Sequence, residues 1–111
     1  MNKSIKLDKL DSNLIKENET YTLLDNTSLE TLVVSKTILH EDKNTTGHFH
    51  KGQEEVYHFI SGHGRIQVGD DMYFINSGDI VLIPDGEFHK VWNTGVGDLE
   101  FICVFNGKRN H

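Results

Sequence analysis

From residue 47 onward the chain alternates short runs of β-branched and aromatic residues with turns that contain glycine. All ten glycines lie in this part of the sequence, and signals such as GHG, GDD, NSG and PDG separate the runs. Many short strands at a spacing of roughly 8–12 residues are typical of an all-β sandwich or barrel. Residues 12–24 are ambiguous, and we assign them to loop or strand. We expect strands at 31–40, 55–61, 65–69, 72–76, 79–84, 89–93 and 99–105.

Length and charge restrict the classes of protein to consider. The 111 residues, 36% of them hydrophobic, fit one domain. The formal net charge of -6 and the absence of a basic patch argue against a nucleic-acid or acidic-membrane partner. No span approaches 18 apolar residues, and the N-terminus has no apolar region, so we expect a cytoplasmic protein. The single cysteine, Cys103, sits in an apolar run and is expected to be buried.

The segment GHFHKGQEEVYHFISGHG, residues 47–64, holds four of the seven histidines. Alternate residues of a strand point to the same face, so His48 and His50 should project side by side. Glu54 or Glu55 could add a carboxylate, and His89 is a further candidate from a later strand. Three imidazoles and one carboxylate suit a divalent transition metal such as Fe, Mn, Co, Ni, Cu or Zn.

Two motifs give the sequence a family resemblance. Residues 78–93, GDIVLIPDGEFHKVWN, match the pattern G(X)5PXG(X)2H(X)3N at every fixed position. Upstream, the pattern G(X)5HXH(X)3,4E(X)6G fits from its first histidine to its last glycine, with Asp42 in place of the leading glycine. The chain thereby resembles the cupin family over residues 31–105. The matched positions are His48, His50, Glu55 and Gly62 in the first motif, and Gly78, Pro84, Gly86, His89 and Asn93 in the second.

The resemblance implies a fold and a set of metal ligands. The fold would be an all-β jelly-roll (double-stranded β-helix) barrel in a single domain. We expect the barrel at residues 31–107, after an N-terminal extension of loop and short strands at 1–30 and before a tail at 108–111. The implied ligands are His48, His50, Glu55 and His89, because the spacing to Gly62 selects Glu55 over Glu54. On a six-coordinate ion this set would leave two adjacent positions open.

Open metal positions favour a small-molecule enzyme. The first hypothesis is metal-assisted proton transfer, of the isomerase or epimerase type, on a small sugar, sugar phosphate or hydroxy or keto acid. Tyr57 is the candidate acid–base group, although its residue type and position favour a packing role over a catalytic one. A metal-dependent dioxygenase and a non-catalytic metabolite-binding module are the alternatives. Small cupins often dimerise through strand swapping or sheet-edge pairing, so we expect a homodimer, with His58 and Trp92 exposed.

Overall fold

The computed structural model describes residues 3–8, 10 and 13–107, and within these ranges every regular element is a β-strand. No described helix is long and apolar enough to cross a membrane. The strands are β1 (Asn13–Glu17), β2 (Tyr21–Asn26), β3 (Leu32–Leu39), β4 (Glu55–Ser61), β5 (His63–Val68), β6 (Asp71–Asn76), β7 (Ile80–Ile83), β8 (His89–Asn93) and β9 (Leu99–Asn106).

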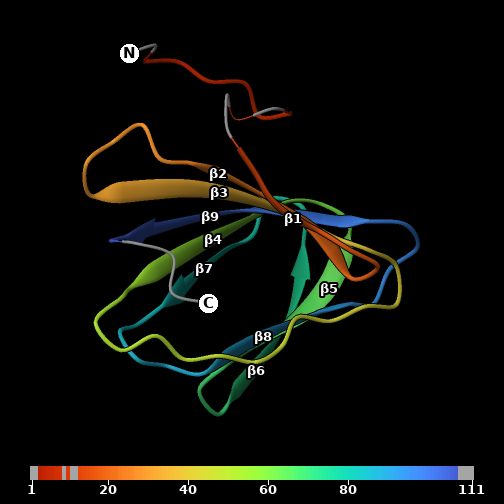
Figure 1. The fold of residues 1–111 in the computed structure, drawn as a ribbon. Helices are drawn as coiled ribbons and strands as arrows, with labels where there is room; N and C mark the ends of the chain where they lie inside the picture. Colours follow the sequence, from red (N-terminus) through yellow and green to blue (C-terminus); the bar gives the residue numbers. More distant parts are fainter. Residues whose placement is uncertain (1–2, 9, 11–12, 108–111) are drawn as a thin grey trace.

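The strands form two antiparallel sheets that face each other as a jelly-roll barrel (Figure 1). The larger sheet has the order β1-β2-β3-β9-β4-β7, and the smaller has the order β6-β5-β8. The long connection between β3 and β4 runs beside β8, to which it is joined by the isolated bridges Asn44↔Trp92 and His48↔His89. The prediction of an all-β jelly-roll barrel is confirmed.

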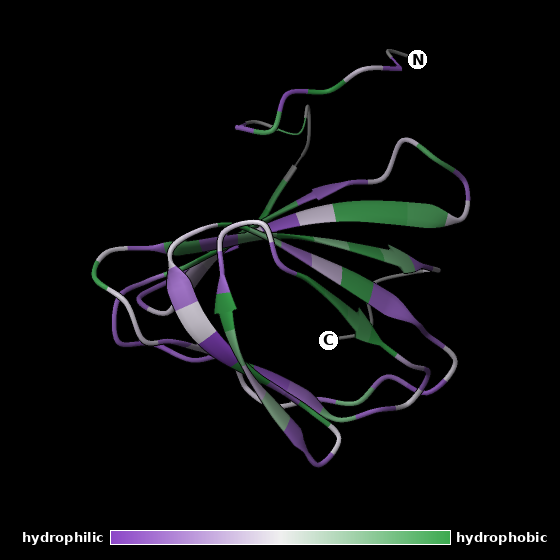
Figure 2. Ribbon diagram, turned by 180° about the vertical axis from the view of Figure 1, so that it is seen from behind, coloured by the Kyte–Doolittle hydropathy of each residue, from purple (hydrophilic) through white to green (hydrophobic). Residues whose placement is uncertain are grey.

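Strict alternation of side chains places the core between the two sheets. In β9 the residues Leu99, Phe101, Cys103 and Phe105 are all buried, while the residues between them are half-buried on the outer face. β4 alternates in the same way from Glu55 through Phe59. Hydrophobic residues concentrate on the strands of the larger sheet, whereas the loops are mostly hydrophilic (Figure 2). Burial of these inward faces is the main stabilising contribution to the barrel.

The N-terminal part of the chain contributes more to the barrel than the sequence suggested. β1 and β2 fall within the predicted extension of residues 1–30, and they form the edge of the larger sheet next to β3. The expected tail at 108–111 lies outside the described residues. The prediction of a turn at His63 is wrong: His63 begins β5, where its exposed ring shares a 2.7 Å hydrogen bond with Oδ1 of Asn76. The domain boundaries themselves stay a prediction.

Two motif positions have clear backbone roles. Asn93 is buried, and its side chain bonds the backbone of the loop that follows β8. Asp42, which stands where the motif has glycine, has a φ of 63°. Aspartate tolerates this left-handed region better than most residues with a side chain. The departure from the motif therefore keeps the backbone conformation that glycine would allow.

Candidate metal centre

Three of the four expected metal ligands meet between the two sheets. Ligand atoms of His50, Glu55 and His89 all lie within 4.8 Å of one another, and all three residues are buried. Glu55 opens β4 in the larger sheet, His89 opens β8 in the smaller sheet, and His50 lies on the connection that leads into β4. The barrel thus brings His50 and His89 together, although they are 39 positions apart in the sequence.

The pair formed by Glu55 and His89 is arranged as two ligands of one ion would be. Nδ1 of His89 lies 3.1 Å from the carbonyl oxygen of Glu87, which can only accept a hydrogen bond, so Nδ1 is the donor. Nε2 of the same ring points to the centre and lies 3.0 Å from Oε2 of Glu55. Two ligands at right angles on an ion, each about 2.1 Å from it, would be about 3 Å apart. The donor types and the spacing fit a divalent transition metal.

His48 stands beside this cluster at the wall of a cavity. Paired backbone hydrogen bonds with His89 (3.1 and 2.8 Å) put the two side chains on the same side. The His48 ring centroid is 5.4 Å from that of His50 and 6.0 Å from that of His89. Burial, followed by the nearby His50 and His89, lowers the pKa of His48 below the ordinary value. A lowered pKa favours the neutral imidazole, which is the form that binds metal.

The two adjacent glutamates have different environments. Glu55 is 3% exposed and faces the histidines, whereas Glu54 is exposed to solvent. Phe49, between His48 and His50, is 69% exposed, so the expected alternation holds even though this segment forms only isolated bridges. Cys103, expected only as a core residue, lies with its Sγ 3.7 Å from Oε1 of Glu55, to which the thiol donates.

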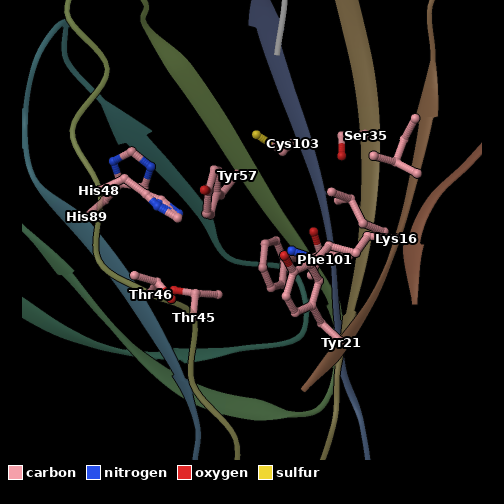
Figure 3. A pocket seen from close by; sticks show the side chains of 13 residues that line it. Lys16, Tyr21, Ser35, Thr45, Thr46, His48, Tyr57, His89, Phe101 and Cys103 are labelled. Atoms are coloured by element: carbon pink, nitrogen blue, oxygen red, sulfur yellow. The ribbon is translucent and has the colours of Figure 1, made fainter. Parts of the chain in front are cut away.

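A cavity of about 130 Å³ opens beside the histidines. His48, His89 and Tyr57 form one wall, and Lys16 and Tyr21 lie on the opposite side (Figure 3). Tyr57 is nearly buried, stacks on Phe101 with ring centroids 5.1 Å apart, and meets the edge of the His89 ring at 5.8 Å. The remaining lining residues are Ile15, Leu23, Ser35, Thr37, Thr45, Thr46, Phe101 and Cys103.

Sequence reasoning missed the wall of this cavity that faces the histidines. Lys16 and Tyr21 fall in the segment assigned to loop or strand, where no motif marks them. Thr45 and Thr46 lie in the connection before His48. The position of Lys16 and Tyr21 depends on the pairing of β1 with β2 and of β2 with β3, and that of Thr45 on its hydrogen bonds to Val91, none of which local sequence patterns specify.

Comparison with known proteins assigns the family. The sequence model described as a cupin domain matches residues 36–105, which is more than half of the chain. The chain is a cupin. All four expected ligands of this cupin lie inside the matched range.

One curated sequence relative and one solved structure carry names related to oxalate. The cupin is 37% identical over 57 residues to an oxalate-binding protein of Thermotoga maritima, a match that covers 51% of this chain and 47% of the relative. The chain thus spans about half the length of the curated relatives it matches. A solved structure described as a predicted oxalate decarboxylase from Thermotoga maritima is 25% identical, with a TM-score of 0.68 and coverage of 77% of this chain and 80% of that one.

A second solved structure shares the fold alone. KdgF from Halomonas sp. superposes with a TM-score of 0.81 over 95% of this chain and 94% of its own, at 13% identity. The barrel is therefore common to cupins with different names, and the activity has to be argued from the residues of the site.

Proposed function

We propose that this cupin holds one divalent transition metal with His48, His50, Glu55 and His89. The carrying observation is the buried convergence of three of these donors within 4.8 Å, with the ring of the fourth beside them. Each histidine can supply a neutral nitrogen and Glu55 a carboxylate oxygen, a set compatible with Fe, Mn, Ni, Zn, Co or Cu. Direct metal analysis of protein purified without added metal identifies which of these metals the protein carries.

The ligand we propose is a small acid with adjacent oxygen donors, such as oxalate or a 2-hydroxy or 2-keto acid. The cavity beside His48 and His89 has a small volume, and hydroxyl groups from Thr45, Thr46 and Ser35 line it. Thr45 Oγ1 accepts a hydrogen bond from the Val91 amide at 3.0 Å, which leaves its own proton available for a ligand oxygen. The names of the two Thermotoga maritima relatives agree with a small acid.

Proton transfer at a C–H bond of a bound 2-hydroxy or 2-keto acid is the reaction we favour, of the isomerase or epimerase type. Oxalate has no carbon-bound hydrogen and would be a ligand only. A metal at this centre would act as a Lewis acid on an oxygen of the ligand. Within the chain, Tyr57 can donate or accept a proton at its phenolic oxygen, since it lines the cavity beside His89. Phe101 holds the Tyr57 ring by stacking and covers that side of the cavity.

A binding protein without catalysis is the second candidate. None of the described residues that line the cavity is an aspartate or glutamate, so the lining offers no carboxylate as a general base. The relative named as an oxalate-binding protein agrees with this role.

Metal content and ligand binding test the proposal together. His89→Ala and Glu55→Gln should lose the metal, whereas Glu54→Gln, at the exposed neighbour, should retain it. If the site variants keep their metal, the assignment is wrong. In metal-loaded protein, loss of deuterium exchange at C2 of a 2-hydroxy acid or at C3 of a 2-keto acid in Tyr57→Phe, with retained binding, supports proton transfer. Binding without exchange in the wild type supports the binding role, and oxygen consumption with these acids supports the dioxygenase alternative.

A homodimer is the assembly we propose. Val56, Ile80 and Leu82, on β4 and the edge strand β7, are 38%, 61% and 69% exposed on the outer face of the larger sheet. A second copy would cover this apolar surface. His58 is exposed on the same outer face. Trp92, expected to be exposed, is half-buried on the smaller sheet, with the charged groups of Arg65 and Lys90 5.1 and 5.2 Å from its ring. Sedimentation should give a dimer that Leu82→Glu dissociates; a wild-type monomer contradicts it.

The expected cytoplasmic location stays a prediction.

A further inference from the structure

Lys16 enters the cavity from the wall that faces the histidines. It belongs to β1, at the edge of the larger sheet, and lines the cavity together with Ile15 (Figure 3). Its Nζ lies 5.9 Å from the centroid of the Tyr21 ring. A lysine ammonium at this distance from an aromatic face is attracted to it, so Tyr21 helps to hold the amine at the cavity.

The pairing of β1 with β2 aims Lys16 inward. Asn18 Oδ1 accepts hydrogen bonds from the amides of Thr20 and Tyr21 and so shapes the turn between the strands. In the resulting register Lys16 lies opposite Leu23, which is buried and lines the cavity. Cross-strand partners share a face, so Lys16 points to the same side.

A β-bulge adds a second residue to this wall. The register shifts between Leu14 and Lys16, which leaves Ile15 as the extra residue. Consecutive residues of a regular strand face opposite sides, yet Ile15 and Lys16 both line the cavity. The local structure of β1 therefore presents one apolar and one cationic side chain to the same space.

Lys16 is the one lysine or arginine among the described residues that line the cavity. It forms no ion pair with any other described residue. The chain as a whole carries a formal charge of -6, so a lysine without an ion-pair partner places a local positive charge at the cavity of an acidic protein. This local positive charge favours an anionic group of the ligand at the position of Lys16.

The space between Lys16 and the histidines suits a short carbon chain. Leu23 and Phe101 supply apolar surface there, and Thr45 supplies a hydroxyl donor. We propose that Lys16 is a specificity residue that binds the distal carboxylate of a short-chain 2-hydroxy dicarboxylic acid, whose hydroxy-acid end lies at the proposed metal ligands. The small cavity favours a carboxylate over the larger phosphate. This inference rests on the proposed function, because it needs the hydroxy-acid end to bind at the metal centre.

Paired probes isolate the role of the distal carboxylate. Lactate and malate have the same hydroxy-acid end, and malate adds one carboxylate; 2-hydroxyglutarate places that carboxylate one methylene farther away. Calorimetric titration of the zinc-loaded protein should show malate or 2-hydroxyglutarate binding about threefold to tenfold more tightly than lactate at low salt. The preference should shrink at about 0.5 M salt, because Lys16 is exposed to solvent at the cavity mouth.

Variants of Lys16 decide the inference. Lys16→Met should bind malate, 2-hydroxyglutarate and lactate with equal affinity, at the lactate affinity of the wild type, and Lys16→Arg should keep the preference. Lys3→Met, which removes the same charge from an exposed site in the N-terminal segment, should behave as the wild type. Equal affinities in the wild type, or a preference that survives in Lys16→Met, overturn the role of Lys16 while lactate still binds. Failure of all three acids to bind the zinc-loaded protein overturns the small-acid part of the proposed function, and the inference with it.

Discussion

Asn93 fastens the loop after β8 to the core, and its replacement by alanine should destabilise the barrel. The side chain is 5% exposed. Its Nδ2 donates to the carbonyls of Leu39 at 3.0 Å and Gly97 at 2.8 Å, and its Oδ1 accepts from the Gly95 amide at 3.0 Å. Asn93→Ala removes all three hydrogen bonds at once.

The size of the effect follows from the burial of the three partners. Leu39 is fully buried, so its carbonyl would lose a partner that water cannot replace, at a cost of about 1–3 kcal/mol. Gly97 is exposed and Gly95 is half-buried, so water can replace those bonds at about 0.5 kcal/mol each. Asn93→Ala should therefore lower the free energy of unfolding by about 2–4 kcal/mol.

Urea denaturation of the metal-free protein, followed by circular dichroism, measures this change. Asn44→Ala, at an exposed asparagine, is the matched control and should change the free energy of unfolding by less than about 0.5 kcal/mol. Asn93→Asp keeps the acceptor for Gly95 but loses both donations, so it should also destabilise. A loss below about 1 kcal/mol in Asn93→Ala would refute the reasoning from buried partners.

The same assay tests three further expectations. Gly64→Ala should cost about 1–3 kcal/mol, because a Cβ would lie 2.5 Å from the carbonyl oxygen of Trp92; an unchanged midpoint contradicts this. Asp42→Val should cost about 1–2 kcal/mol at its positive φ, whereas Asp42→Gly should cost nothing. The His48 pKa is lowered by burial, so the unfolded chain binds its proton first and stability should fall as pH drops below 6.5. His48→Gln should flatten that pH dependence, and an equal slope in both proteins would disprove the link.

The sequence predicted the barrel well because alternation and turn signals are local. The expected strand at 99–105 corresponds to β9, and Cys103, which was expected to be buried, lies on its inward face. Asn93 was found from the second motif alone, and in the structure its side chain forms hydrogen bonds with the backbone of Gly95 and Gly97. The alternation of residues around His48 and His50 was also correct, although the segment has only isolated bridges to β8.

The rest depended on contacts between segments that are distant in the chain. The contact between Cys103 and Glu55 requires the pairing of β4 with β9, and no spacing of residues in the sequence predicts it. The inward direction of Lys16 requires the register of β1 on β2, which a bulge interrupts. For the same reason the sequence could not tell that His58 and Trp92 lie on different sheets. The metal-ligand assignment itself stays a prediction until metal content is measured.

In this cupin the hairpin of β1 and β2 and the proposed metal ligands come from two separate parts of the chain. The proposed metal ligands all lie within residues 36–105, whereas Lys16, Tyr21 and Leu23 come from the hairpin before that range. Because β1 is the edge strand of the larger sheet and pairs with β2 alone among the described strands, we expect substitutions at its exposed Lys16 to leave the metal ligands undisturbed. Ligand choice could thus be redesigned, or diverge between relatives, by exchange of a single edge hairpin while the metal chemistry is kept.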